Sequence, residues 1–505
     1  MFHRLLFTWA CLLVSLATLS SSYQNSADLY VSPAGKDSNS GTAGQPVKTI
    51  QRAADLAKPG STIHVADGIY CEEVKVRRGG NQQAGFVTFE SQLIHRAILD
   101  GACLNVIPEH NAMFELADVS FVRVKGFEMR NLRTSDPESV PWGIRVVGSG
   151  SHIELLQNDV HHIEQNFKVA KGQNANGFGI GVYGTSAETP ISDLVIDGNQ
   201  VHHLKTGNSE SLVVNGNVSG FRITKNIVHD NSNIGIDVIG FEHTAPDPAV
   251  DRARDGVVSE NTVYDITSRG YLGDAPNSDG IYVDGGTRIL IERNIVHDVD
   301  YGIEMASEHR DGDTSHVIAR NNLVYSCHAS GFSIGGYDLK RGRTEDVMIV
   351  NNTIYKNDTA RTGGGEFLMQ FYMSRNVFKN NIVVVGEHGK LMMSRSGPSG
   401  GVPTVSIDHN VYLFEKGEAL IGSFDAKDFS NLGEYLKNTG NDANSVFADP
   451  EFVDPRSGDF HLKANSPAEN RGKNLGTDFV GSVDLDGRPR VKAGRIDAGC
   501  YQTPN

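Results

Sequence analysis

Two nearly identical stretches decide the fold: NIVHDNSNIGID at residues 226–237 and NIVHDVDYGIEM at residues 294–305. They belong to a series of segments that each continue from Asn with alternating apolar residues, and this Asn recurs at Asn131, Asn158, Asn199, Asn226, Asn261, Asn294, Asn322, Asn352, Asn381 and Asn410. The spacings are 27, 41, 27, 35, 33, 28, 30, 29 and 29 residues. Alternation predicts half-buried strands, and short strands repeated at this period indicate a solenoid whose units bury their apolar faces by stacking.

We therefore predict an all-β chain, a single-stranded right-handed parallel β-helix of the pectate-lyase-like solenoid type. Asn at one fixed place per coil tolerates a left-handed turn. Its amide can also bond to the Asn of the next coil and form a ladder. The His residues of the VHD units are expected to belong to this scaffold. The longer spacings after Asn158 and Asn226 predict long loops, which often form the walls of binding sites.

The chain divides into four predicted parts. Residues 1–22 read as a secretory signal peptide, with one Arg, an apolar run and small residues, cleaved near Ser20 to Tyr23. Residues 23–80 predict a strand, a short amphipathic capping helix and the first coils. Residues 81–415 form the β-helix with its active face, and residues 416–505, rich in Pro, Gly and Asp, an irregular C-terminal cap. The protein is thus expected to be secreted or periplasmic, and no further segment is apolar enough to span a membrane.

Composition narrows the possible partners. The net charge of −15 over 505 residues disfavours nucleic acid, because no basic surplus is available to neutralise phosphates. We expect a monomer. Outside the leader stand Cys71, Cys103, Cys327 and Cys500, which show neither a disulfide framework nor zinc-ligand spacing. Buried free thiols are the favoured reading, with a Cys71–Cys103 bridge between neighbouring coils as the alternative.

The second strand of several coils displays acidic residues. When these strands are aligned on their glycines, the first and third residues after each glycine are apolar and should point into the core. The second and fourth residues after it should then point outward. The outward set includes Asp237, Tyr282, Asp284, Glu304 and Ser333. Carboxylates on coils about 4.8 Å apart disfavour joint ionisation. One ionised and one protonated carboxylate are what glycosidic hydrolysis requires, so we predict a glycosidase with Asp284 and Glu304 as catalytic residues and Asp237 as a third acid.

Further residues are candidates for holding a carbohydrate polymer or oligosaccharide. Aromatic rings can stack on sugars, and Asn215 falls in the same outward column as Asp284. The predicted substrate-binding residues are Tyr282, Asn215, Glu308, His309, Tyr337, Lys340 and Arg341. Asp279, in the NSDG stretch, is expected to be a turn residue. This hydrolase interpretation requires no cofactor and no metal.

The run GIYVDGGTRILIERNIVHDVDYGIEMASEHRDG, residues 280–312, resembles the active-site stretch of the β-helix β-xylosidase family of glycoside hydrolases. In that family an Asp after an apolar–aromatic strand is the nucleophile, and a Glu one coil later is the acid/base. The resemblance implies that Asp284 is the nucleophile and Glu304 the acid/base.

The same coils also resemble the chondroitinase B and alginate lyase group of polysaccharide lyases. That resemblance implies a Ca²⁺ site made of Asp284, Glu304 and Glu308, with the basic loop Lys340, Arg341 and Arg343 taking part in β-elimination. A Ca²⁺-dependent polysaccharide lyase or uronate epimerase acting on a polyuronate is therefore the alternative enzyme. A non-catalytic, carbohydrate-binding β-helix is the remaining alternative.

Overall fold

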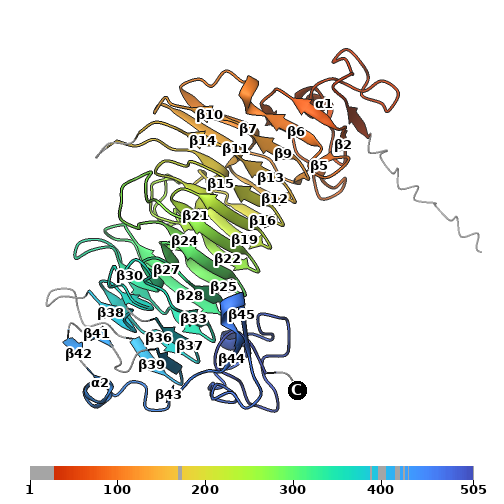
Figure 1. Ribbon diagram of the computed structural model, residues 1–505. Helices are drawn as coiled ribbons and strands as arrows, with labels where there is room; N and C mark the ends of the chain where they lie inside the picture. The colour runs from red at the N-terminus through yellow and green to blue at the C-terminus, as the bar shows by residue number, and fades with distance from the viewer. Residues whose placement is uncertain are drawn as a thin grey trace, which may run out of the picture.

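The computed structural model describes residues 28–168, 173–386, 389–395, 405–415, 421–424, 427–429 and 431–503. The predicted signal peptide lies outside these residues. The described chain winds through successive coils, and Figure 1 shows them stacked from the orange N-terminal end to the blue C-terminal end. Strands of neighbouring coils pair in parallel throughout the stack, and the coils form three long sheets.

The first sheet is built from β1 (Leu29–Val31), β2 (Thr62–Val65), β5 (Val87–Ser91), β8 (Val122–Lys125), β12 (Gly150–Leu156), β16 (Ile191–Asp197), β19 (Val218–Thr224), β22 (Arg254–Ser259), β25 (Thr287–Glu292), β28 (Thr314–Arg320), β32 (Met348–Val350), β36 (Asn376–Lys379) and β39 (Val405–Asp408), with β31 (Thr344–Glu345) and β35 (Met373–Ser374) alongside.

The second sheet carries the candidate site and consists of β4 (Val74–Val76), β7 (Glu109–Ala117), β11 (Ser139–Gly148), β15 (Phe178–Gly184), β18 (Glu210–Gly216), β21 (Ile234–Ile239), β24 (Asp279–Asp284), β27 (Tyr301–Ser307), β30 (Ser330–Gly336), β34 (Phe367–Met369), β38 (Met392–Ser394), β41 (Gly422–Phe424) and β42 (Lys427–Phe429).

The third sheet carries the repeated Asn segments and consists of β3 (Gly68–Tyr70), β6 (Ala97–Asp100), β9 (Glu128–Arg130), β13 (Asp159–His161), β17 (Gln200–His202), β20 (Ile227–Asn231), β23 (Thr262–Ile266), β26 (Ile295–Val299), β29 (Leu323–Tyr325), β33 (Thr353–Tyr355), β37 (Ile382–Val385), β40 (Val411–Phe414) and β43 (Val446–Phe447). This arrangement confirms the predicted parallel β-helix.

A continuous Asn ladder runs through the turn before the third sheet. From Asn158 to Asn410, each side-chain amide donates to the Oδ1 of the Asn one coil on, at 2.9–3.3 Å. The predicted ladder is therefore confirmed, but two details differ. The left-handed residue is the one before the Asn, such as Lys225 with φ 56°. Asn131 lies outside the ladder, because on its coil Phe127 takes the place of the ladder Asn and the Phe127 N–H donates to Asn158 Oδ1.

The His residues of the VHD units form a second stack on the outside of the third sheet, as expected of scaffold residues. The rings of His161, His202, His229, Tyr264, His297 and Tyr325 lie stacked in this order, with centroids 4.7–5.1 Å apart. Like the Asn ladder, the stack arises because one residue type repeats at the same register on successive coils.

Structure outside the coils covers both ends of the core. The helix α1 (Ile50–Leu56) begins at the N-cap Thr49 and buries Ile50, Ala53 and Ala54 against the first coils. The helix α2 (Leu432–Thr439) buries Tyr435 against Phe424 and Phe429 near the other end. The remaining short elements are α3 (Thr477–Val480), two 3₁₀ turns (Gly101–Cys103 and Pro455–Ser457), and the pairs β10 (Arg133–Thr134) with β14 (Glu164–Gln165) and β44 (Phe452–Asp454) with β45 (Asp459–Leu462).

The C-terminal segment lies along the third sheet rather than only across the end of the stack. Phe452 and Phe460 of the β44–β45 hairpin pack against Tyr355, and Cys500 bonds to Thr353. In Figure 1 this blue segment lies beside β33 and β37. It therefore covers outward side chains of the last coils.

The cysteines depart in part from the favoured reading. Cys71 and Cys103 form a disulfide, so free thiols were the wrong expectation for this pair. The bridge forms because β3 and β6 lie on neighbouring coils, which brings the two residues that follow them together. Cys327 and Cys500 are buried free thiols among the described residues, as predicted. No helix in the described ranges is long and apolar enough to cross a membrane.

Candidate functional site

The acidic residues of the second sheet point away from the core but are not open to solvent. Ile236 and Val238 lie in the core on either side of Asp237, so the predicted alternation is correct. However, Asp237, Asp284 and Glu304 are only 2%, 7% and 8% exposed. The expectation of a surface display was wrong, because loops that leave the second sheet cover these side chains.

The register of the sheet brings the predicted residues together. Asp237, Tyr282 and Glu304 follow one another in a single column across β21, β24 and β27. Asp284 stands two residues further along β24, opposite Ala306. Asn215 pairs with Ile239, which places it in the column of Asp284, as predicted.

Around these columns lies a group of carboxyl side chains that we call the acid cluster: Glu210, Asp237, Glu242, Asp279, Asp284, Glu304 and Glu308. Burial raises the pKa of Asp237, Glu210 and Asp279 well above the ordinary range, and neighbouring carboxylates raise it further. Asp237 Oδ1 and Asp279 Oδ1 are buried and have no hydrogen-bond partner among the described residues. These three carboxyl groups therefore ionise less readily than carboxyl groups exposed to water.

A hollow of about 510 Å³ opens over the acid cluster, and we call it the main hollow. Loop residues such as Leu272 and Asn277, between β23 and β24, help to line it. Its full lining is Asn208, Asn233, Ile234, Leu272, Asn277, Asp279, Tyr282, Tyr301, Glu304, Glu308, Tyr337, Gln370 and Arg395.

Glu304 is the predicted catalytic residue that faces this hollow. Burial raises the pKa of Glu304 to about 6, although hydrogen bonds from Asp279 and Gln370 act in the opposite direction. Gln370 Nε2 donates to Glu304 Oε1 at 2.5 Å. The hydrogen bond between the two carboxyl groups raises the pKa of Asp279 and lowers that of Glu304, so Asp279 is the donor. Glu304 is therefore held by two donors and titrates close to neutral pH.

Asp284 is held at the side of the main hollow. Its Oδ1 accepts from the backbone N–H of Glu308 at 2.9 Å, and its Oδ2 lies 3.3 Å from His309 Nε2. Burial alone would lower the pKa of His309, but the contact with Asp284 raises it above the ordinary value. Neither Asp284 nor Asp237 is among the described residues that line the hollow. Asp284 is thus a fixed carboxylate behind Glu308 and His309.

Asp279, Gln370 and Arg395 are among the residues of the main hollow that sequence reasoning missed. Asp279 is not a turn residue: it begins β24 opposite Tyr301, and its side chain bonds to Glu304. Gln370, 66 residues away in sequence from Glu304, and Arg395 come from coils further along the stack. The one available signal was the position of Asp279 in the repeat, next to the Gly280 on which the outward face was aligned.

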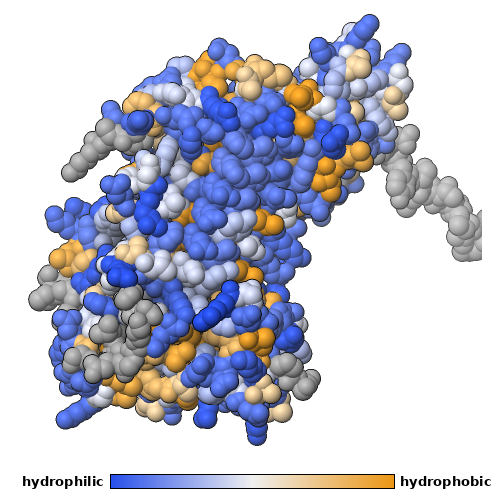
Figure 2. Space-filling model, in the orientation of Figure 1, coloured by the Kyte–Doolittle hydropathy of each residue, from blue (hydrophilic) through white to orange (hydrophobic). Residues whose placement is uncertain are grey.

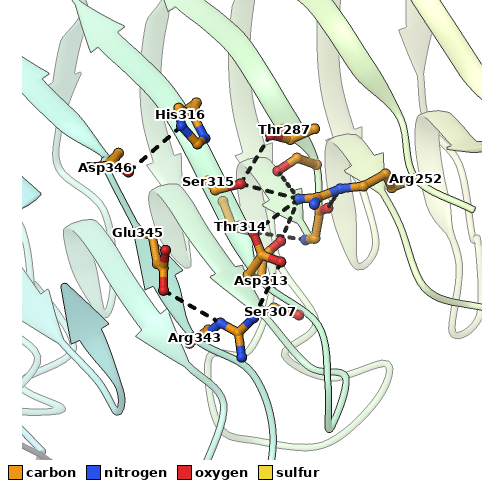
Figure 3. Close-up of polar contacts among 12 residues, drawn as sticks. Arg252, Thr287, Ser307, Asp313, Thr314, Ser315, His316, Arg343, Glu345 and Asp346 are labelled. Carbon is orange, nitrogen blue, oxygen red and sulfur yellow. Dashed lines mark hydrogen bonds and ion pairs between the residues drawn. The ribbon is translucent and has the colours of Figure 1, made fainter. Parts of the chain in front are cut away.

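Arg252 fixes the turn that follows Asp284. Its guanidinium donates to the carbonyl oxygens of Gly285 at 3.0 Å, Gly286 at 3.1 Å and Asp313 at 2.7 Å, and Figure 3 shows these contacts converging on it. Burial lowers the pKa of Arg252, although Asp313 opposes this effect. Arg252 therefore joins the turn after β24 to the loop after β27. Asp284 directly precedes this turn, and Glu308 is the first residue of this loop.

The predicted basic loop lies at the rim. Arg341 pairs with Asp338 at 2.9 Å and lies over the ring of Tyr337, 4.2 Å from its centroid. Tyr337 is 47% exposed and lines the main hollow, whereas Lys340 and Arg341 do not line it. Of the residues predicted to bind substrate, Tyr282, Glu308 and Tyr337 thus lie in the hollow itself.

A second hollow of about 600 Å³ adjoins the first and shares Asn208 with it. Trp142 and Phe178 stack at its floor with ring centroids 3.8 Å apart. Glu210 and Glu242 line its edge, and Asn215, one of the predicted binding residues, donates to Glu242 at 2.7 Å. Together the two hollows extend along the second sheet across several coils.

The three carboxylates proposed for Ca²⁺ are not gathered around one point. Asp284, Glu304 and Glu308 do not form a group with oxygen atoms within 4.8 Å of one another. Among the described residues the group that meets this distance is His203, His229 and Asp230, on another face of the molecule.

Comparison with known proteins shows the family. The family model described as "Right handed beta helix region" matches residues 142–413. This chain belongs to the right-handed β-helix family. Residues 33–77, at the N-terminal end of this β-helix, match a second model, "Protein of unknown function (DUF1565)". The chain is also 36% identical over 440 residues to "Uncharacterized protein YwoF" of Bacillus subtilis. This alignment covers 87% of this chain and 92% of the relative.

Solved structures share the fold of this β-helix. One is the A-module of the mannuronan C-5 epimerase AlgE6 from Azotobacter vinelandii, with 12% identity and a TM-score of 0.53. The superposition covers 79% of this chain and 93% of the epimerase module. The PL6 family alginate lyase AlyGC matches 95% of this chain and 59% of its own, with 14% identity and a TM-score of 0.50. At these identities the likeness establishes the fold alone.

Proposed function

We propose that this β-helix hydrolyses glycosidic bonds in an oligosaccharide or polysaccharide, with Glu304 as the proton donor. The observation that carries the proposal is the state of Glu304: it is buried, faces the main hollow and has a pKa raised to about 6. A carboxylic acid that titrates near the working pH can both give and regain a proton during turnover. Such an acid is what departure of a sugar leaving group requires.

Asp284 is the proposed carboxylate partner. In the first step Glu304 transfers its proton to the glycosidic oxygen as the bond to the anomeric carbon breaks. For Asp284 to attack that carbon and form a glycosyl ester, Glu308 and His309, behind which it lies, must move aside when the substrate binds. In the second step the ionised Glu304 takes a proton from water, whose oxygen attacks the same carbon and releases Asp284. Asp284 is held for this role by the N–H of Glu308 and by His309, which lie 2.9 and 3.3 Å from its two oxygens.

The charge of the site favours neutral sugars. A uronate carboxylate would add a negative charge beside carboxyl groups that already resist joint ionisation, which is unfavourable unless a cation accompanies it. The neighbouring second hollow gives space for further sugar units and offers the Trp142–Phe178 pair. We therefore propose an extended, uncharged chain of sugars as the substrate.

A panel of neutral and uronate polysaccharides with two readouts on each sample tests the reaction class. New reducing ends without absorbance of an unsaturated uronate are expected for a hydrolase. Reducing ends that rise together with that absorbance would contradict hydrolysis, because β-elimination produces the unsaturated product. Glu304→Gln and Asp284→Asn should each lose activity about 10²-fold or more. If Asp284→Asn retains activity, the partner carboxylate is wrongly assigned.

A polyuronate lyase or epimerase is the second candidate, and one pair of residues favours it. Tyr301 and Arg395 both line the main hollow and form a hydrogen bond, and burial raises the pKa of Tyr301 to about 12. Arg395 opposes this rise and favours the phenolate form of Tyr301, which would serve as the base that removes the proton next to a uronate carboxylate. A Ca²⁺ ion bound here would need ligands from the substrate as well, because no three carboxyl groups of the described residues bring oxygens within 4.8 Å of one another. Activity on a polyuronate that EDTA abolishes would favour this candidate.

The site of action is proposed from the N-terminal sequence. A cleaved leader at residues 1–22 would place the enzyme in the periplasm or outside the cell, where polysaccharides are accessible. N-terminal sequencing of the exported protein tests this, and an N-terminus still at Met1 would contradict it.

A further inference from the structure

The outer turn of the third sheet places histidines and acids in one column, away from the acid cluster. His203 and Asp230 each follow the stacked histidine of their coil, with φ of 54° and 53°. Because His202 pairs with His229 in the sheet, His203 and Asp230 occupy equivalent places on neighbouring coils. Both side chains are exposed, and His229 beside them is partly buried.

These three side chains bring metal-ligating atoms together. One donor atom each from His203, His229 and Asp230 lies within 4.8 Å of the other two. The donors of a tetrahedral zinc ion lie about 3.3 Å apart, so the exposed side chains of His203 and Asp230 would have to move closer together to bind an ion. No other His, Cys, Asp or Glu group of three in the described part of the chain meets this distance.

The hydrogen bonds around His203 prepare it as a ligand. His202 Nε2 lies 3.0 Å from Asp159 Oδ1, and an ionised carboxylate only accepts, so His202 carries its proton on Nε2. His202 Nδ1 is then an acceptor, and His203 Nδ1, at 2.7 Å, must donate to it. This chain leaves His203 Nε2 with a free lone pair. Carboxylate-supported histidines of this kind orient imidazole ligands in metal sites.

His229 already faces the carboxylate ligand. Its Nδ1 lies 2.6 Å from Asp230 Oδ2. When the His229 proton moves to Nε2, the Nδ1 lone pair points at the space beside Asp230. A cation there would then meet two imidazoles and one carboxylate.

We propose that His203, His229 and Asp230 bind a divalent transition-metal ion of the Zn²⁺ class. Two imidazole nitrogens and one carboxylate oxygen suit Zn²⁺, Ni²⁺ or Cu²⁺ better than Ca²⁺ or Mg²⁺, which prefer oxygen ligands. Water completes the coordination, because the site is open to solvent. The ion links the coil of β17 to the coil of β20 and therefore stabilises the stack where it joins them.

The repeat supplies a matched control for the test. His297 and Asp298 form the same pair, with Nδ1 2.7 Å from Oδ2, in the second copy of NIVHD. On the preceding coil, however, the place equivalent to His203 is taken by Asp265, so this pair has no second imidazole at that place. The two pairs thus differ in the neighbour that completes the proposed site.

Calorimetric titration of the untagged protein with Zn²⁺ tests the proposal, with Co²⁺ absorption as a second readout of coordination. We expect one equivalent of Zn²⁺ to bind and to raise the melting temperature. His203→Ala and Asp230→Asn should each weaken binding about tenfold or more, whereas His297→Ala should leave it unchanged. Absence of binding by the parent protein, equal binding by His203→Ala, or an equal loss in His297→Ala would overturn the proposal.

Discussion

At the scale of single residues, the chemistry of the site depends on how Glu304 holds its proton. Burial raises the pKa of Glu304 to about 6, while donation from Asp279 and Gln370 limits the rise. As proton donor Glu304 must be protonated, so we expect kcat/KM to fall as pH rises through about 6. A pH–rate profile measures this, and a rate that is constant from pH 5 to about pH 8 would contradict the assignment.

Asp279 lowers that pKa through its hydrogen bond to Glu304. Asp279→Ala removes the donor and should raise the pKa of Glu304, so the alkaline limb of the profile moves to higher pH. Asp279→Asn keeps a donor and should leave the limb in place. Profiles of the two variants distinguish this positioning role from a purely structural one, because an equal effect of both would speak against the hydrogen bond.

Residue patterns predicted where the site side chains point, but not what surrounds them. Alternation along β21, β24 and β27 fixed the outward direction of Asp237, Tyr282 and Glu304. Their burial could not be predicted, because the covering loops find their places through packing between coils distant in sequence. Asp279 and Gln370 were missed for the same reason, since their contacts with Glu304 exist only after the coils stack.

At the scale of elements, the Asn ladder makes a specific stability prediction. Asn261 donates to Ile223 O and Asn294 Oδ1, and accepts from both the backbone and the side chain of Asn226. Asn261→Ala leaves these buried groups unpaired and should cost about 2–4 kcal/mol of unfolding free energy. Asn131 lies outside the ladder, and glycine readily adopts its φ of 63°, so Asn131→Gly should lower the unfolding free energy by less than about 1 kcal/mol. Denaturant titration compares them, and equal losses would contradict the ladder's role.

The disulfide adds a second prediction for elements. It closes 32 residues between the ends of β3 and β6. Replacing Cys71 and Cys103 by Ser should lower stability by about 2–4 kcal/mol, mainly by releasing the unfolded chain. Limited proteolysis should then cut first within residues 71–103. A double variant as stable and as resistant as the parent would show that the bridge contributes nothing.

At the scale of the whole molecule, raised carboxyl pKa values link stability to pH. Burial raises the pKa of Glu304 to about 6, of Glu308 to about 7 and of Glu366 to about 8, against about 4.5 in an unfolded chain. The folded state therefore binds more protons across this range, and its stability falls as pH rises from about 5 to about 8. The melting temperature should drop by roughly 5 °C or more over this interval.

Glu366→Gln provides the control, because its amide needs no proton to remain neutral beside Asn357. This variant should flatten the dependence between about pH 7 and 8. A melting temperature that rises over the same interval in the parent protein would contradict the pKa values on which the argument rests.

The overall architecture followed from the sequence because the coil is short and repeats the same residues at the same register. The spacing of Asn158, Asn199 and Asn226 was enough to predict parallel coils and their ladder. The position of the C-terminal segment against β33 and β37 could not be predicted, because residues 446–503 carry no repeat that would specify which strands they pack against. The face in Figure 2 is mainly hydrophilic, with scattered hydrophobic patches.

The most direct test of the central claim is the response of Glu304→Gln to the leaving group of its substrate. If Glu304 donates the proton, the variant should lose activity about 10²-fold or more on a natural oligosaccharide. It should keep most of its activity on an aryl glycoside whose phenol departs without protonation. Equal loss on both substrates would contradict the role of Glu304 as proton donor, and unchanged activity on both would remove it from the reaction.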